Sequence, residues 1–232
     1  MDLQEASLVA DPARHWYYRA KTAAMLRLLD RRVPVEVLDV GAGSGLFSRA
    51  LLRETTAARA TCVDPGYPTD RDVVEFGKPL GFRRRIDASA ADLVLMMDVL
   101  EHVPDDAGLV ATYAAQVQAG TRFLVTVPAF MSLWSGHDVP LRHYRRYTLR
   151  QLETAVTTGG LRVIRGCYFF GGVLPIAAAT RLGARPSTPR SQMADVPGPV
   201  SAVLAAICRV ELAVMRHNRL GGLTACVVAV KP

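Results

Sequence analysis

The stretch that decides the fold is Val37-Leu38-Asp39-Val40-Gly41-Ala42-Gly43-Ser44-Gly45. Its first four residues continue a short apolar run that starts at Val35, which predicts a buried β-strand. Three glycines follow at every second position, and glycine lets the backbone turn sharply and approach a ligand without a clashing Cβ. Residues 46–55 then have a helical pattern, and the first turn of a helix offers free N–H groups. The sequence therefore predicts a strand–turn–helix unit with a ligand at the turn.

The same order of elements continues along the chain. Further strands are expected at residues 60–64, 83–86, 92–98, 122–128, 161–170 and 225–230. Helices are expected at residues 15–31, 104–118, 148–159, 171–185 and 200–216, and a loop with a helix at 66–78. This alternation predicts a single Rossmann-like α/β domain with a seven-stranded, mostly parallel sheet.

The expected domain, residues 1–232, has four parts. These are an N-terminal lid helix within 1–32, a cofactor-binding core at 33–170, a helical insertion at 171–220 and a last strand within 221–232. In the insertion, the apolar face of the helix at 200–216 is expected to pack into the core. That face consists of Val203, Ile207, Val210 and Val214.

Composition bounds the class of protein. Half of the 232 residues are hydrophobic, and 28 Lys and Arg against 21 Asp and Glu give a net charge of +7. That excess favours an anionic partner without choosing among phosphates, carboxylates, nucleic acid and a membrane surface. The four cysteines lack metal or redox spacing, which predicts buried, reduced thiols. The N-terminus does not read as a secretory signal, and the uncharged stretch 166–180 is too short for a membrane span. We therefore expect a cytoplasmic protein with no integral membrane segment.

The glycine turn and Asp64, at the end of the second expected strand, fit two nucleotide ligands. A carboxylate there can accept both ribose hydroxyls of a nucleoside. A dinucleotide site has GxGxxG spacing, but Leu46 occupies the position of its third glycine. The GxGxG spacing, preceded by Asp39, resembles motif I of the class I S-adenosylmethionine-dependent methyltransferases. An NAD-binding dehydrogenase and a purely structural turn are the alternatives.

A second segment, Asp92–Asp105 (DLVLMMDVLEHVPD), resembles the fourth-strand motif of the same family. The resemblance covers roughly residues 35–165 and implies S-adenosylmethionine as cofactor and S-adenosylhomocysteine as product. By resemblance, Asp64 binds the ribose, Pro65 packs near the adenine, and His102 is more often a structural residue at a helix start than a base. The implied cofactor-binding residues are Asp39, Gly41, Ala42, Gly43, Gly45, Asp64, Pro65, Asp87, Met97, Asp98 and Val99.

The N-terminal segment HWYYRAK, residues 15–21, resembles the aromatic helix that covers the cofactor in one methyltransferase subgroup. Such a helix would act as a lid that excludes water. Tyr17 is a candidate catalytic residue and Trp16 a candidate substrate contact. Because Tyr17 and Tyr18 point to different sides of a helix, at most one of them should reach the pocket. The alternative is an aromatic cluster in the core.

Residues 129–147 form a long loop rich in aromatic, His and Arg side chains, and loops of this length are usually functional. His137 beside Asp138 could be a base with its orienting carboxylate, and His143 is the other candidate base. The arginines could clamp a phosphate or carboxylate, or one could form a salt bridge to Asp138. Candidate substrate contacts in the loop are Phe130, Trp134, Arg145 and Tyr147.

The sequence thus predicts methyl transfer from S-adenosylmethionine to a small molecule, with oxygen as the favoured acceptor. A natural-product or envelope-sugar pathway of bacterial secondary metabolism is the expected setting. One alternative is base-driven ring closure on the same fold, including cyclopropane formation from a sulfonium adduct. A nucleic-acid methyltransferase is another, although no RNA-binding module or base-flipping motif is present. A non-catalytic cofactor-binding protein is a third alternative. The acceptor and the oligomeric state stay open.

Overall fold

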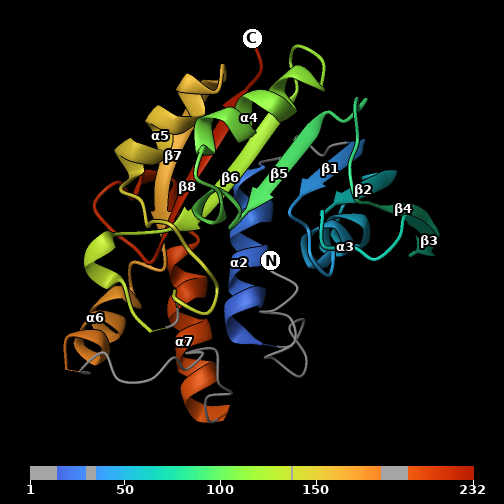
Figure 1. Ribbon diagram of the computed structural model, residues 1–232. Helices are drawn as coiled ribbons and strands as arrows, with labels where there is room; N and C mark the ends of the chain where they lie inside the picture. Colours follow the sequence, from blue (N-terminus) through green and yellow to red (C-terminus); the bar gives the residue numbers. More distant parts are fainter. Residues whose placement is uncertain (1–14, 30–34, 137, 184–197) are drawn as a thin grey trace.

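The computed structural model describes residues 15–29, 35–136, 138–183 and 198–232, and its centre is an eight-stranded sheet (Figure 1). The strands are β1 (Glu36–Val40), β2 (Arg59–Val63), β3 (Arg71–Glu75), β4 (Lys78–Arg83), β5 (Leu93–Met97), β6 (Arg122–Pro128), β7 (Arg162–Phe169) and β8 (Thr224–Val230). The helices are α2 (Trp16–Leu28), α3 (Leu46–Glu54), α4 (Asp106–Ala115), α5 (Leu149–Thr158), α6 (Leu174–Gly183) and α7 (Gly198–Glu211). Short 3₁₀ turns are η1 (Leu100–His102), η2 (Met131–Leu133) and η3 (Met215–His217).

The order of strands in the sheet is β3-β4-β2-β1-β5-β6-β8-β7. The five strands from β4 to β6 are mutually parallel, whereas β8 is antiparallel to both of its neighbours. From β1 the chain builds outward to β2 on one side and later to β5 on the other. This is a switch point, where the carboxyl ends of adjacent strands leave a crevice for a ligand. The Rossmann-like α/β fold predicted from the alternation is confirmed.

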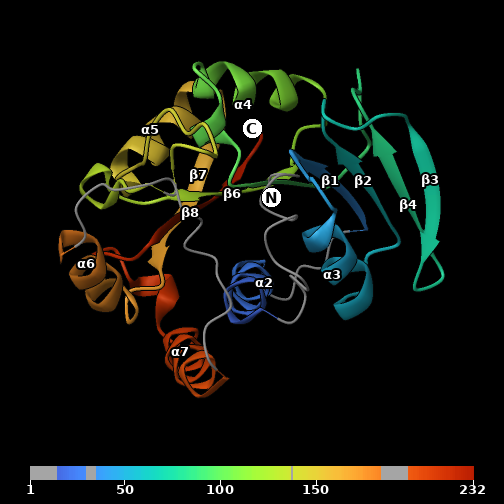
Figure 2. The ribbon, with the colours of Figure 1, turned by 60° about the horizontal axis from the view of Figure 1, so that its bottom comes forward.

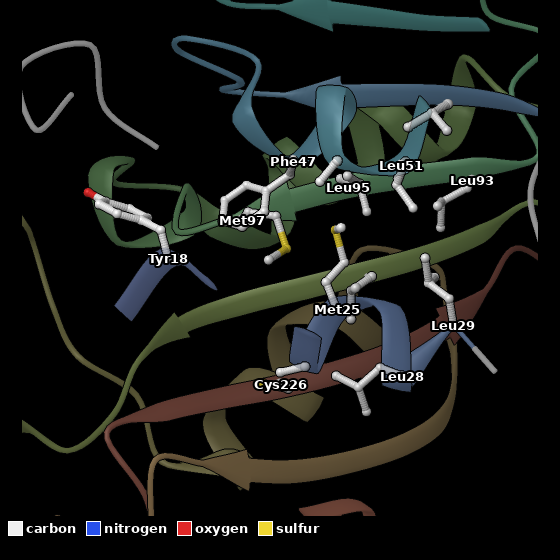
Figure 3. Packing of buried hydrophobic residues seen from close by; sticks show 14 of the residues in the cluster. Tyr18, Met25, Leu28, Leu29, Phe47, Leu51, Leu93, Leu95, Met97 and Cys226 are labelled. Atoms are coloured by element: carbon white, nitrogen blue, oxygen red, sulfur yellow. The ribbon is translucent and has the colours of Figure 1, made fainter. Parts of the chain in front are cut away.

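Two helical layers cover the sheet (Figure 2). Helices α4 and α5 lie on one face, and α2, α3 and α7 lie on the other. Each face buries its own hydrophobic cluster. In the cluster on the face that α2, α3 and α7 cover, Met25 and Leu28 pack against side chains of the sheet, as Figure 3 shows. The central parallel strands β1, β5 and β6 are buried on both faces, which explains why they read as nearly continuous apolar runs.

One expected element is wrong. Residues 66–78 were predicted as a loop with a helix, but β3 lies there as an antiparallel edge strand against β4. The β-branched pair Val73 and Val74 favours a strand. Phe76 and Gly77 both have positive φ, the geometry of a tight hairpin turn, and β4 therefore starts at Lys78 instead of Arg83. The hairpin adds an eighth strand to the predicted seven.

The buried face of α7 also differs from the prediction. Leu204, Cys208 and Glu211 are its buried residues. Val203 and Val210, predicted to face the core, are 59% and 75% exposed, and Val214 beyond the helix is 60% exposed. The apolar stripe read from the sequence therefore points mostly outward. A carboxylate turns inward because Glu211 accepts hydrogen bonds from the backbone N–H groups of Gly171 and Gly172.

Helix α2 is a layer of the domain as well as a neighbour of the site. It begins at a cap in which His15 Nδ1 accepts from the backbone N–H of Tyr17. Its role as a lid stays a prediction.

All four cysteines are buried and free, which confirms the expected reduced thiols. Among the described residues, no helix has the length and apolar character needed to cross a membrane.

Candidate functional site

The glycine turn lies at the carboxyl end of β1, beside the carboxyl end of β5. Gly41, Gly43 and Gly45 have φ of 62°, 53° and 73°, a left-handed backbone that L side chains rarely adopt. A Cβ on Gly41 would stand 2.8 Å from Val99 Cγ2. Gly41 thus lets Val99, two residues after β5, pack directly on the turn.

Asp64 closes the turn from the end of β2. Its carboxylate accepts hydrogen bonds from the backbone N–H of Gly43 (3.1 Å) and of Gly66 (2.8 Å). The hydroxyl of Tyr67 donates to the carbonyl of Gly43 at 2.6 Å. Tyr67 is buried against Phe82, with ring centroids 5.4 Å apart. The sequence analysis missed Tyr67, although an aromatic residue directly after an Asp-Pro-Gly turn was a usable signal.

Asp39 is buried beneath the turn and fixes the start of α3. Ser48 Oγ donates to its carboxylate at 2.8 Å. Burial raises the pKa of Asp39 to about 6, although the hydrogen bond from Ser48 opposes the shift. The structure therefore places Asp39 as a support of the glycine turn.

The remaining predicted residues near β2 and β4 are exposed. Pro65 follows Asp64 at the surface. The side chain of Asp87 is 87% exposed and pairs loosely with Arg85, with Nε and Oδ1 3.6 Å apart. Both residues lie beyond the carboxyl ends of their strands, on the same edge of the sheet as the glycine turn.

Asp98, directly after β5, forms an ion pair with Lys21 of α2. Its other oxygen accepts from Thr126 Oγ1 at 3.2 Å. Burial alone would lower the pKa of Lys21, but the carboxylate of Asp98 holds this pKa above its usual value. Conversely, burial would raise the pKa of Asp98, and Lys21 holds it below its usual value. The pair ties α2 to the edge of the sheet that carries the glycine turn, and sequence reasoning did not predict Lys21.

The loop after β6 is held by a buried cluster around Asp138. Arg146 binds this carboxylate through two hydrogen bonds, Nε–Oδ1 at 2.7 Å and Nη2–Oδ2 at 3.0 Å. His143 Nδ1 lies 2.8 Å from Asp138 Oδ1. Although burial raises the pKa of Asp138, hydrogen bonds from His143 and Arg146 hold it well below its usual value. An ionised carboxylate only accepts, so Nδ1 carries a proton, and in the neutral ring Nε2 then presents the lone pair.

The orienting carboxylate thus serves His143. His137, the other candidate base, lies outside the described residues. The salt bridge to Asp138 that the sequence analysis considered is made by Arg146. The rings of His102 and His143 meet edge to face with centroids 4.7 Å apart, and the backbone N–H of Tyr144 donates to the carbonyl of Glu101 at 2.7 Å. The loop is therefore packed against η1, whose preceding residue Val99 covers the glycine turn.

Several residues around these groups have strained backbones. Asp98, Phe130 and Arg142 have φ of 57°, 58° and 55°. A non-glycine residue in this region costs of order 1–3 kcal/mol, and such residues cluster at functional sites. All three lie in segments that follow the carboxyl ends of β5 and β6, at the edge of the sheet that carries the glycine turn, which supports this edge as the site.

The predicted aromatic contacts fall into two groups. Tyr17 stacks on Phe170 with centroids 5.0 Å apart, and Trp16 meets Phe170 edge to face at 6.1 Å. Phe130 stacks on Tyr168 at 5.1 Å, and Trp134 is half-buried at the end of η2. Half-buried rings are compatible with both predictions, an aromatic cluster in the core and a contact to a bound substrate.

Arg145 and Tyr147 join the loop to α4. Arg145 Nη1 and the Tyr147 hydroxyl both donate to Asp106 Oδ2, at 3.1 Å and 2.8 Å. Tyr147 is 2% exposed, and its hydroxyl also lies 3.1 Å from the carbonyl of Leu100. Arg145 and Tyr147 line an open groove of about 660 Å³ that extends along α5. Their side chains thus hold η1 and α4 together as well as lining this groove.

With this geometry, comparison with known proteins decides the family. Residues 13–165 match the model of a methyltransferase domain family. The chain belongs to the class I S-adenosylmethionine-dependent methyltransferases. The resemblance that the glycine turn and the DLVLMMDVLEHVPD segment indicated is confirmed.

Individual relatives of this methyltransferase are distant. A ubiquinone biosynthesis O-methyltransferase of Methylobacterium sp. (strain 4-46) is 33% identical over 55% of this chain and 59% of that protein. The chain spans about half the length of the curated relatives it matches. A methyltransferase solved in complex with the Haloferax volcanii activator Trm112 has a TM-score of 0.57 at 20% identity, covering 92% of this chain and 91% of that chain.

A calicheamicin biosynthesis methyltransferase solved with S-adenosylhomocysteine has a TM-score of 0.52 at 20% identity, covering 66% of this chain and 52% of that chain. At this level of identity, the two solved structures support the fold of this chain and carry no argument about its substrate or partners.

Proposed function

We propose that this methyltransferase transfers the methyl group of S-adenosylmethionine to a hydroxyl oxygen of a small molecule. Its family supports the cofactor, and the curated relatives named O-methyltransferases support oxygen as acceptor. The observation that carries the proposal is the buried Asp138–His143 pair, packed on η1 beside the glycine turn. It provides a polar, oriented group where an acceptor would meet the cofactor.

On the cofactor side, the edge of the sheet offers separate groups for each part of the ligand. The carboxylate of Asp64 accepts the ribose hydroxyls, and the turn Gly41–Gly45 approaches the methionine part. Asp87 and Pro65 lie toward the adenine, and Val99 packs over the turn from the other side. The exposed positions of Pro65 and Asp87 suit contacts made only when the nucleoside is bound.

On the acceptor side, His143 is the activating group. The acceptor oxygen attacks the methyl carbon in line with the carbon–sulfur bond, whose electron pair stays on sulfur. The hydroxyl must lose its proton, and the lone pair on His143 Nε2 can receive it. Asp138 keeps Nδ1 protonated and stabilises the imidazolium. Tyr17, Trp16, Phe130 and Trp134 are proposed to line the acceptor space, which would exclude water and favour a flat or apolar molecule.

The first experiment measures binding of S-adenosylmethionine, S-adenosylhomocysteine and NAD side by side by calorimetry and thermal shift. We expect binding of both sulfur nucleosides and none of NAD. Binding of NAD alone by folded protein would overturn the cofactor assignment. Candidate acceptors from natural-product and envelope-sugar chemistry are then screened by mass spectrometry. A product heavier by one methylene group supports methyl transfer, whereas an isomer of unchanged mass identifies ring closure.

Substitution then tests the role of His143. Without a group to activate the hydroxyl, turnover by His143→Ala should fall about 10²–10⁴-fold. Affinity for S-adenosylhomocysteine should be unchanged, because His143 lies on the acceptor side. His217→Ala, on η3 and far along the chain, is the matched control and should keep full activity. Unchanged turnover in His143→Ala would place activation elsewhere.

A further inference from the structure

Three potential metal ligands converge on one point at the acceptor side of the site. They are Glu101 and His102 from η1 and His143 from the loop after β6. One ligand atom of each, a carboxylate oxygen or a ring nitrogen, lies within 4.8 Å of the others. Two neighbouring residues of a 3₁₀ turn and a loop residue fixed by Asp138 thus present nitrogen, nitrogen and oxygen to a common space.

Glu101 is the residue that needs a partner there. It is 0% exposed, yet neither carboxylate oxygen has a hydrogen-bond partner among the described residues. Leaving a buried carboxylate unsatisfied is costly, and buried charges in proteins are paired or coordinate metals. Lys21, the cation that acts on Glu101, is already paired with Asp98.

His143 is held as metal-bound histidines are held. Its Nδ1–H donates to Asp138, which fixes the ring and turns the lone pair of Nε2 away from the carboxylate. Asp138 is itself fully buried and clamped by Arg146. The ring of His102 stands edge to face against this imidazole at 4.7 Å.

We propose that Glu101, His102 and His143 bind a divalent first-row transition-metal ion of the Zn²⁺ type. Two imidazoles and one carboxylate are a ligand set that suits such ions better than Mg²⁺ or Ca²⁺. Three protein ligands leave at least one position open for an oxygen of water or acceptor. The bound ion neutralises the carboxylate of Glu101.

The inference rests on the proposed function for its catalytic part only. The ion coordinates the acceptor oxygen and lowers the pKa of the hydroxyl, whose proton leaves to water. The oxygen then forms its bond to the methyl carbon while the carbon–sulfur bond breaks, with no change of oxidation state. With the ion bound, the one lone pair of His143 Nε2 is used as a ligand, so water takes the place of His143 as the proton acceptor, and the methyl transfer itself is unchanged.

The test of binding needs no substrate. Protein stripped with EDTA is titrated with Zn²⁺ in a calorimeter, and Co²⁺ is added separately to follow its visible absorption. We expect one equivalent of Zn²⁺ to bind and Co²⁺ to develop a ligand-field spectrum. No binding of either ion by protein that still binds S-adenosylhomocysteine would overturn the inference.

Variants locate the ion. Glu101→Gln and His143→Ala should abolish the one-equivalent binding, and Asp138→Asn should weaken it about 10–100-fold. His217→Ala and Glu153→Gln, outside the cluster, are matched controls and should bind as the parent does. Binding that survives both ligand substitutions would mean an adventitious ion elsewhere and would overturn the site. Affinity for S-adenosylhomocysteine, measured for every variant, shows that each one is folded.

The two proposals fail in different ways. Methyl transfer that EDTA abolishes and Zn²⁺ restores supports the catalytic part of the inference. Undiminished methyl transfer in EDTA would overturn that part while leaving the proposed function intact. Absence of cofactor binding would overturn the proposed function and leave the metal titration as an independent result.

Discussion

Asp64 is the residue on which cofactor affinity should depend most. Asp64→Ala removes the proposed acceptor for the ribose and the observed acceptor for the N–H of Gly43. Hydrogen bonds to a charged group contribute about 1.5–3 kcal/mol, so affinity for S-adenosylhomocysteine should fall about 10–100-fold. Asp70→Ala is the control, since the carboxylate of that exposed residue accepts a hydrogen bond from the backbone N–H of Arg84, away from the glycine turn. Equal affinities of the two variants in calorimetry would contradict the assignment.

Asp39 gives the protein a pH-dependent stability. Its pKa is raised from 3.8 to about 6 in the folded chain, so the folded state binds more protons than the unfolded state between these values. Its contribution to stability is therefore present below pH 3.8 and is lost as the pH rises to about 6.

Asp39→Asn should remove this dependence while keeping an oxygen for Ser48. The stability of the variant relative to the parent should rise from about pH 4 to about pH 6 and then stay constant. Urea unfolding at pH values across this range measures the difference, with the exposed Glu54→Gln as control. A difference in stability that does not change with pH would show that the pKa of Asp39 is not raised in the folded chain.

At the scale of elements, α7 tests which side of a helix is buried. Leu204 is 8% exposed and Val210 is 75% exposed. Leu204→Ala should lower the free energy of unfolding by about 2–5 kcal/mol, whereas Val210→Ala should change it by less than about 0.5 kcal/mol. Chemical denaturation compares the two. A larger loss of unfolding free energy in Val210→Ala than in Leu204→Ala would show that the buried side is the one predicted from the apolar spacing.

Helix α7 and strand β3 show why some elements resist prediction. Helix α7 has apolar residues at helical spacing on its buried side (Leu204 and Cys208) and on its exposed side (Val203 and Val210). Periodicity therefore predicts the helix without showing which side is buried. In β3 the segment RDVVE is short and charged at both ends, and only pairing with β4 makes it a strand. By contrast, the central parallel strands β1, β5 and β6 are buried on both faces, and their apolar runs are unambiguous.

At the scale of the whole molecule, the proposed cofactor site is assembled from strands far apart in the sequence. Bound S-adenosylhomocysteine should therefore slow hydrogen exchange together at Gly41–Ser48, Asp64–Tyr67 and Asp98–His102, which meet at one edge of the sheet. A ligand at 100 times its Kd stabilises the folded state by about 2.7 kcal/mol. The β3–β4 hairpin turn is the internal reference. Protection confined to α6 and α7 would place the ligand elsewhere.

The sequence by itself determined the α/β alternation, the glycine turn, Asp64 and the family, because these are local patterns. Glycine spacing and a strand's apolar run hold whatever the rest of the chain does. The tertiary structure alone decided that Asp138 orients His143, that Lys21 pairs with Asp98, and that the buried Glu101 lies beside two histidines. These contacts join residues from separate elements, and their partners depend on how the loop after β6 packs on η1. Burial in that packing, which no local pattern encodes, gives these side chains their chemistry.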